Sequence, residues 1–161
     1  MNNRSPSLDL SHFPVMLNEV IKISSPSQGG KFIDCTFGGG GYSKQLLKFP
    51  KTIVKGLDRD KKVEAIGKEL EKKFPKRFQF HQIIFSQIDT VSKKKVDIII
   101  FDLGLSSIQL NDLNRGFSFK STERLDMSMG LNQISAQDAI NNLSELDLKL
   151  IIKILGEEKE A

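Results

Sequence analysis

Phe32-Ile33-Asp34-Cys35-Thr36-Phe37-Gly38-Gly39-Gly40-Gly41 is an apolar run that ends in four glycines, and Ile53-Val54-Lys55-Gly56-Leu57-Asp58 is a second run that ends in a carboxylate. Glycines let a backbone turn tightly and approach a ligand without an intervening Cβ. An acid at the end of the following strand can accept both hydroxyls of a ribose. The two runs predict an α/β protein that holds a nucleoside-bearing cofactor at the carboxyl ends of its strands.

The glycine loop departs from the dinucleotide fingerprint G-x-G-x-x-G, because Gly38 and Gly40 are followed by Ser43 at the third glycine position. A pyrophosphate needs close approach to a helix N-terminus. A cofactor without phosphate, such as S-adenosylmethionine, needs only a glycine floor beneath its amino-acid end. The alternative is a tight turn without a ligand, but four adjacent glycines carry an entropy cost that a turn alone does not require. The sequence therefore favours a ligand.

Two carboxylates follow predicted strands. Asp58 stands 24 residues after Asp34, near the spacing of a ribose-binding acid. Its alternative role is to cap the helix expected near Lys61, although Asp60 can also do that. Asp102 ends the fourth apolar run, which in a doubly wound sheet lies beside the first strand, where ligands bind. Its alternative role is to cap the loop that follows.

Composition bounds the remaining possibilities. The chain has 161 residues, of which 39% are hydrophobic and 27% charged, and this is typical of one globular domain. No apolar run approaches the roughly 20 residues of a membrane span. The polar first residues lack the core of a secretory signal, and one cysteine forms no internal disulfide, so we expect a cytoplasmic protein. The net charge of +4 fits a nucleic-acid partner or merely a solvated helix face.

Histidine and cysteine are too few for metal chemistry. Two histidines and the single Cys35 form no cluster with zinc-ligand spacing, so we predict no metal site. His12 stands near a predicted helix start and His81 within a predicted strand, and both are poor candidates for acid–base work.

Apolar runs alternate with helical patterns along the chain, which predicts a parallel sheet. The runs centre on Phe32-Ile33, Ile53-Val54, Phe78–Phe80 and Val96–Phe101, and helices are expected at 12–24, at 61–74 and twice after Ser135. The fourth run is continuous, which predicts a strand buried on both faces. Residues 1–11 read as a loose tail and 103–134 as an irregular stretch. Ser135 and Ser144 each begin a capping box, and Gly156 ends the second of these helices.

Several longer strings resemble the bacterial small-subunit rRNA cytosine-N4 methyltransferases. The most specific are Asp102-Leu103-Gly104-Leu105-Ser106-Ser107 with Gln109-Leu110, Arg115-Gly116-Phe117-Ser118-Phe119, and Leu125-Asp126-Met127 with Met129. The others are His12–Leu17 with Glu19-Val20, Asp34–Gly38 with Gly40-Gly41, Asp58-Arg59-Asp60, Phe85-Ser86 and Gly156-Glu157-Glu158. Together these strings run through nearly all of residues 12–160.

The resemblance implies a Rossmann-like class I methyltransferase with an incomplete parallel sheet in the order 3-2-1-4. It implies that residues 12–108 are the N-terminal part of the methyltransferase domain, and that 109–161 are a loop and the beginning of a helical substrate-recognition insertion. It also implies methyl transfer from S-adenosylmethionine to the exocyclic N4 of a cytidine in small-subunit rRNA. The cofactor contacts carried over from the family are Gly40, Gly41, Tyr42, Asp58, Phe85, Asp102 and Gln109.

The chain departs from the family pattern at four positions. Tyr42 stands where the family usually has His, Ile108 replaces Pro, Ser128 replaces Arg and Gly130 replaces Asp. Many base-amine methyltransferases use Asp/Asn-Pro-Pro-aromatic, whereas this chain has Asp102-Leu103-Gly104-Leu105, so we assign no catalytic residue. Family members also continue well beyond residue 161, so the chain resembles an N-terminal portion.

Two other functions stay open at this point. One is an NAD-dependent oxidoreductase, which the broken fingerprint disfavours. The other is an inactive or RNA-binding fragment, which the missing C-terminal portion favours. The fourth strand would leave an uncovered apolar edge, so we expect the chain to self-associate or to pair with a missing C-terminal piece, and to be weakly active or inactive alone.

Overall fold

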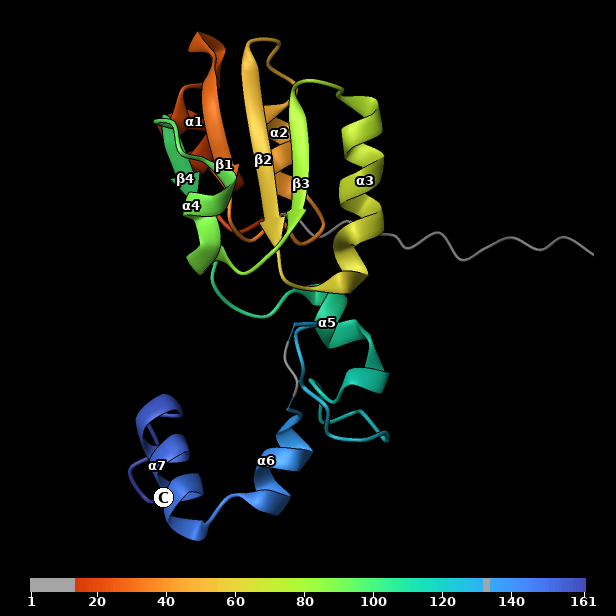
Figure 1. Ribbon diagram of the computed structural model, residues 1–161, viewed down its shortest axis with the longest axis vertical. Coiled ribbons are helices and arrows are strands. Elements are labelled where there is room, and N and C mark those ends of the chain that lie inside the picture. The colour runs from red at the N-terminus through yellow and green to blue at the C-terminus, as the bar shows by residue number, and fades with distance from the viewer. Residues whose placement is uncertain (1–13, 132–133) are drawn as a thin grey trace, which may run out of the picture. The chain divides into compact units, whose positions relative to one another are not determined.

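The computed structural model describes residues 14–131 and 134–161, and the chain divides into two units, Met1–Ser107 and Ile108–Ala161. The first unit holds a sheet with helices on both of its faces (Figure 1). The second unit holds short helices joined by irregular segments.

Four parallel strands form the sheet of the first unit. They are β1 (Gly30–Asp34), β2 (Thr52–Asp58), β3 (Phe78–Gln82) and β4 (Ile98–Ile100), in the order β3-β2-β1-β4. Asp34 lies opposite Gly56, and Asp58 lies opposite Gln82. The predicted strand order and fold class are therefore confirmed. Because all four strands run the same way, their carboxyl ends lie at one edge of the sheet, where α/β proteins bind ligands.

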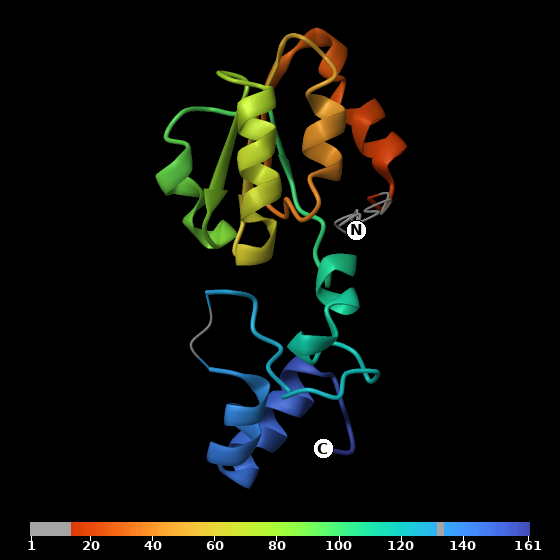
Figure 2. The same ribbon diagram turned by 90° about the vertical axis from the view of Figure 1, so that its right-hand side faces the viewer.

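Helices cover the two faces of the sheet unequally. α1 (Leu17–Ser24), α2 (Gly41–Leu46) and α3 (Glu64–Lys73) lie on one face, and α4 (Ile88–Val91) lies on the other (Figure 2). Short 3-10 helices are η1 (Pro26–Gln28), η2 (Lys61–Val63) and η3 (Phe85–Gln87). Among the described helices α1 to α4 of this unit, only the one-turn α4 lies over the second face.

The core lies on both faces of the central strands. On the α3 face, the Phe37 ring packs against those of Phe78 and Phe80, with centroids 5.6 and 5.2 Å away. On the α4 face, Ile33 and Leu57 are buried beneath partly buried Ile88. These apolar contacts stabilise the strand ends that carry the predicted site carboxylates, because buried side chains remove apolar area from water.

Two sequence predictions about this unit are wrong in detail. β4 spans three residues, and Ile99 and Phe101 are 44% and 49% exposed, although the continuous run predicted burial on both faces. Within the described residues β4 pairs with β1 alone, so no strand pairs with its far side. The helix expected over 12–24 begins at Leu17, because Met16 adopts a left-handed φ of 53°. His12 lies outside the described residues.

The second unit contains α5 (Ser107–Asn111, beginning at the unit boundary), η4 (Leu113–Arg115), α6 (Ala136–Asn142) and α7 (Glu145–Leu155). The predicted capping box at Ser135 is confirmed, since Ser135 Oγ accepts the Asp138 N–H at 3.0 Å and Asp138 Oδ2 accepts the Ser135 N–H at 3.1 Å. At Ser144 one half of the predicted box is present, since Ser144 Oγ accepts the Asp147 N–H at 3.2 Å, but of these two described boxes only the one at Ser135 has the return bond to the N-cap N–H. α7 ends at Leu155 with Gly156 as its C-cap, as predicted. Within the described residues, no helix combines the length and the apolar character needed to cross a membrane.

Candidate functional site

The glycine loop joins β1 to α2. Gly38 and Gly40 have φ of +50° and +76°, a left-handed backbone that glycine adopts without strain. A Cβ added at Gly40 would lie 2.8 Å from the Phe37 ring, whereas a Cβ at Gly39 would meet no atom within 4 Å. The loop therefore packs on its inner side against the core and offers an open glycine surface at Gly39.

Asp34, the last residue of β1, connects this strand to the helix that follows the glycine loop. Its side chain is fully buried, and Oδ2 accepts the Ser43 hydroxyl at 2.7 Å. Burial raises the pKa of Asp34 to about 6, against the lowering effect of the Ser43 hydroxyl and of the Thr36 and Ser43 backbone N–H groups. Because the carboxyl has no solvent exposure, Asp34 holds the start of α2 to the end of β1 and does not face a ligand directly.

Asp58 ends β2 and accepts two backbone hydrogen bonds. Gly38 donates to Oδ2 at 2.8 Å and Asp60 donates to Oδ1 at 2.9 Å. Burial raises the pKa of Asp58, while these N–H groups lower it. The backbone N–H of Arg59 also lowers this pKa, and because a carboxylate offers about four acceptor positions, about one remains for a ribose hydroxyl. Asp60 caps η2 by accepting the Lys62 N–H at 3.0 Å, so the capping role weighed for Asp58 belongs to Asp60.

Tyr42, in the first turn of α2, connects three segments. Its hydroxyl donates to the Val15 carbonyl, and its Oη lies 3.5 Å from Asp102 Oδ2. Burial, followed by the negative charge of Asp102, raises the pKa of Tyr42 to about 12. Tyr42 is therefore a neutral donor at physiological pH, and it ties the segment before α1 to the end of β4.

Asp102 follows β4 and is partly exposed. Its backbone N–H donates to Thr36 Oγ1 at 2.8 Å, which fixes it beside the start of the glycine loop. Its Oδ2 lies 3.5 Å from the Tyr42 hydroxyl. Asp102 is thus held at the sheet edge with its carboxylate available to an incoming hydrogen-bond donor.

An aromatic pair stands at the same edge. Phe85 opens η3 after β3, and its ring meets that of Phe101 edge to face, with centroids 5.5 Å apart. Phe85 is 45% exposed and Phe101 is 49% exposed. Two half-exposed rings in a T-shaped arrangement offer an apolar surface against which a planar heterocycle can pack.

The structure brings six of the seven predicted contact residues to the carboxyl edge of the sheet in the first unit. They are Gly40, Gly41, Tyr42, Asp58, Phe85 and Asp102. The seventh, Gln109, lies in α5 within the second unit and is buried. Gly41 is close-packed, because a Cβ there would lie 2.2 Å from Pro14 Cγ, so this glycine serves packing as well.

Sequence reasoning missed Ser43, Thr36 and Phe101 as parts of this edge. Ser43 lies in the first turn of α2 and Thr36 lies two residues after β1, positions at which polar residues commonly cap, so nothing in the sequence marks their long-range partners. Phe101 was assigned to the buried strand. Its position next to Asp102 was the available signal. Across residues 14–131 and 134–161, no group of three or more His, Cys, Asp or Glu could hold a metal ion.

Nearly the whole chain is similar to proteins of one family. The model of the MraW methylase family matches residues 9–161. Ribosomal RNA small subunit methyltransferase H of Bartonella tribocorum is 45% identical over 150 residues, which are 93% of this chain and 45% of that protein. The protein of the same name from Brucella ovis is 37% identical over 166 residues, covering 99% of this chain and 48% of that protein. The chain thus spans just under half the length of these relatives.

Proposed function

The chain belongs to the MraW methylase family, and from this premise we propose that its sheet edge binds S-adenosylmethionine for transfer of a methyl group to the exocyclic N4 of a cytidine in small-subunit rRNA. The observation that carries the proposal is the meeting of the glycine loop, Asp58, Phe85 and Asp102 at one edge of the sheet. The relatives are named ribosomal RNA small subunit methyltransferases, which supports the choice of substrate.

The residues present fit such a cofactor. Asp58 is partly exposed and keeps about one acceptor position beyond those that backbone N–H groups occupy, which fits a hydroxyl of a ribose. Phe85 offers a half-exposed ring to an adenine, and Gly39 leaves open backbone for the amino-acid end. When bound, S-adenosylmethionine supplies a methyl group activated by a positively charged sulfonium.

The exocyclic amine of cytosine is a weak nucleophile, because its lone pair is delocalised into the ring. Its reactivity rises when a fixed acceptor takes a hydrogen bond from the amine as positive charge develops on nitrogen. Asp102 is the carboxylate that we assign to this task, with Thr36 holding its backbone and Tyr42 lying beside its Oδ2. The target base has to leave its stack, or be unpaired already, to reach this edge.

Family membership leaves the NAD-dependent alternative without support. The alternative of an RNA-binding chain without activity differs from the proposal in one measurement. Purified chain is mixed with radiolabelled S-adenosylmethionine and with small ribosomal subunits that lack the modification. The proposal expects label on a cytidine N4, placed by nuclease digestion and mass spectrometry, and expects the reaction to occur in the cytoplasm, where the subunits are. Cofactor binding without label would favour the non-catalytic alternative.

A further inference from the structure

A cavity of about 350 Å³ lies on the α4 face of the sheet, away from the carboxyl edge. It is formed by the starting halves of β1 and β2 and by the segment that follows α4. Figure 1 shows these halves of β1 and β2 extending beyond α4. A volume near 350 Å³ is at the small end of the range for ligand sites, and it suits about one nucleotide.

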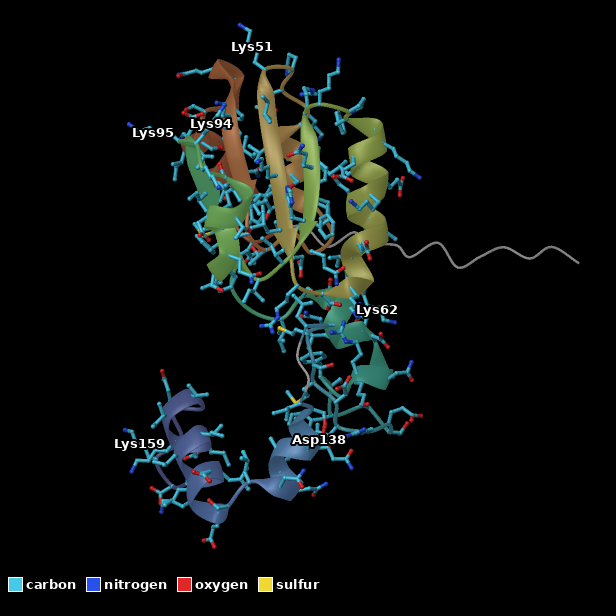
Figure 3. The ribbon with its side chains drawn as sticks, in the orientation of Figure 1. Lys51, Lys62, Lys94, Lys95, Asp138 and Lys159 are labelled. Carbon is cyan, nitrogen blue, oxygen red and sulfur yellow. The ribbon has the colours of Figure 1, made fainter. Side chains whose placement is uncertain are left out.

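Four lysines line this cavity, namely Lys31, Lys55, Lys93 and Lys94, and we call it the lysine groove. No acid lines it. The neighbouring Asp97 uses Oδ2 to accept the Lys31 backbone N–H at 2.7 Å. Figure 3 shows Lys51, Lys94 and Lys95 at the end of the unit where β2 begins, so further positive charge flanks the groove. Clustered like charges repel, and a bound anion relieves that repulsion.

Lys55 is the most ordered of the four. It is half-buried, and its Nζ donates to the Val91 carbonyl at 2.6 Å. An ammonium has three donors, so two stay available to a ligand after this bond. Lys31, Lys93 and Lys94 are exposed, and none of them forms a salt bridge within residues 14–131 and 134–161. One fixed and three adaptable cations are thus directed at a single groove.

The floor of the groove is apolar. Ile33 is buried there, Ile53 is 43% exposed, and Val96 is partly buried. Lysine ammonium groups above an apolar floor match a nucleotide, whose phosphate is anionic and whose base and sugar carry apolar surface. An inorganic anion would make no use of Ile53, and this distinguishes the groove from a simple charge cluster.

We propose that the lysine groove binds the phosphodiester backbone of RNA. The choice of RNA over other polyanions rests on the proposed function. Lys55 and Asp58 belong to the same strand and are three residues apart, which is about 10 Å. An RNA strand whose target base is at the carboxyl edge can therefore continue across the α4 face into the groove within a few nucleotides.

The test compares two variants of equal charge. One is Lys31→Ala/Lys93→Ala/Lys94→Ala, and the control replaces three exposed lysines elsewhere in the first unit, Lys48→Ala/Lys72→Ala/Lys73→Ala. Lys55 is left in place, because its bond to Val91 contributes to the fold. Thermal unfolding checks that both variants fold. Fluorescence anisotropy with a labelled single-stranded RNA of mixed sequence gives the affinity over a range of salt concentrations.

The groove variant should lose about tenfold or more in RNA affinity at low salt, and its log–log salt slope should shrink by about 2, since each phosphate contact on a single strand contributes about 0.7. The control should lose less than about half of its affinity. Equal losses in the two variants, or no RNA binding by the unaltered chain, would overturn the inference. So would competition by polyglutamate as strong as that by unlabelled RNA of the same charge.

Two further measurements are needed. One distinguishes an RNA strand from a free nucleotide as the ligand, and the other distinguishes failure of the groove proposal from failure of the proposed function. Free cytidine monophosphate should compete far more weakly than unlabelled RNA. Equal competition by the two at the same nucleotide concentration would overturn the inference, because the groove would then bind a single nucleotide and not an RNA strand. Calorimetry with S-adenosylmethionine should give the same affinity for the groove variant as for the unaltered chain. A chain that binds RNA through the groove but binds no S-adenosylmethionine would contradict the proposed function while supporting the groove.

Discussion

Asp58 Oδ2 accepts the backbone N–H of Gly38, with 2.8 Å between the nitrogen and the oxygen. This bond joins the end of β2 to the glycine loop after β1, which are 20 residues apart in the sequence. The acid that we expect to hold a ribose therefore also fixes the loop that we expect to lie beneath the amino-acid end of the same ligand. Binding and loop geometry are coupled through one carboxylate.

Asp58→Ala should weaken binding of S-adenosylmethionine by about 1.5–3 kcal/mol, because hydrogen bonds to a charged group contribute in this range. Asp58→Asn should fall between the alanine variant and the unaltered chain, since its amide oxygen still accepts but carries no charge. Isothermal titration calorimetry measures both. Asp89→Ala, at an exposed acid of α4, is the control for net charge. Unchanged affinity in the alanine variant would remove Asp58 from the site.

Most of the sheet, and the placement of six of the seven predicted cofactor contacts at its carboxyl edge, followed from local sequence. The runs ending at Asp34, Asp58 and Asp102 predict strands, and parallel strands bring their carboxyl ends together whatever the details of packing. The bond from Ser43 to Asp34 and the bond from Tyr42 to Val15 join residues whose proximity depends on how α2 packs. No periodic pattern in the sequence marks such pairs of residues, so these hydrogen bonds could not be predicted.

Burial of β4 could not be predicted for a related reason. A continuous apolar run indicates a strand suited to burial on both faces, but burial itself depends on neighbouring elements. Ile99 and Phe101 remain about half exposed, because β1 is the sole strand beside β4 in the described residues. The lysine groove could not be predicted from the sequence either, since Lys31, Lys55 and Lys93 come together only in the fold.

Ser43→Ala should destabilise the chain by an amount that grows with pH. The folded pKa of Asp34, about 6, lies above its ordinary value of 3.8, so its burial costs stability as pH rises through this window. The Ser43 hydroxyl offsets that cost, and without it the pKa of Asp34 rises further. We expect a loss of about 1 kcal/mol at pH 4, where the carboxyl is protonated, and of about 2–3 kcal/mol at pH 7.

Urea unfolding of the two proteins at several pH values measures this difference, and groups that titrate alike in both proteins cancel. Ser86→Ala, at an exposed serine, should show little effect at any pH. A cost of Ser43→Ala that stays constant between pH 4 and pH 7 would mean that Asp34 is not the group to which the hydroxyl is coupled.

Tyr42→Phe should loosen the segment before α1. The Tyr42 hydroxyl donates to the Val15 carbonyl, and the ring itself is buried, so phenylalanine keeps the packing and removes this bond together with the 3.5 Å contact to Asp102 Oδ2. We expect a loss of about 1 kcal/mol in the free energy of unfolding. Hydrogen exchange should be faster in the first turn of α1, where the Val20 N–H donates to the Met16 carbonyl at 2.9 Å. Exchange there at the unaltered rate would show that Tyr42 does not hold this segment.

Self-association through β4 is the last expectation. β4 pairs on one side with β1, and within residues 14–131 and 134–161 no strand pairs with its other side, where backbone groups of the edge stay available. Ile99 is 44% exposed and Phe101 is 49% exposed, and an apolar strand edge of this kind invites pairing with a second chain. Light scattering of the purified chain should therefore show a mass that rises with concentration.

Ile99→Lys places a charge on the edge strand and should lower that mass toward the monomer, because charged side chains discourage edge-to-edge pairing. Ile23→Lys, at an isoleucine of α1 that is 80% exposed, adds the same charge away from the edge and should leave the mass as it was. A monodisperse monomer at every concentration would refute the open-edge prediction, and an equal response to both lysine variants would assign the association to net charge rather than to β4.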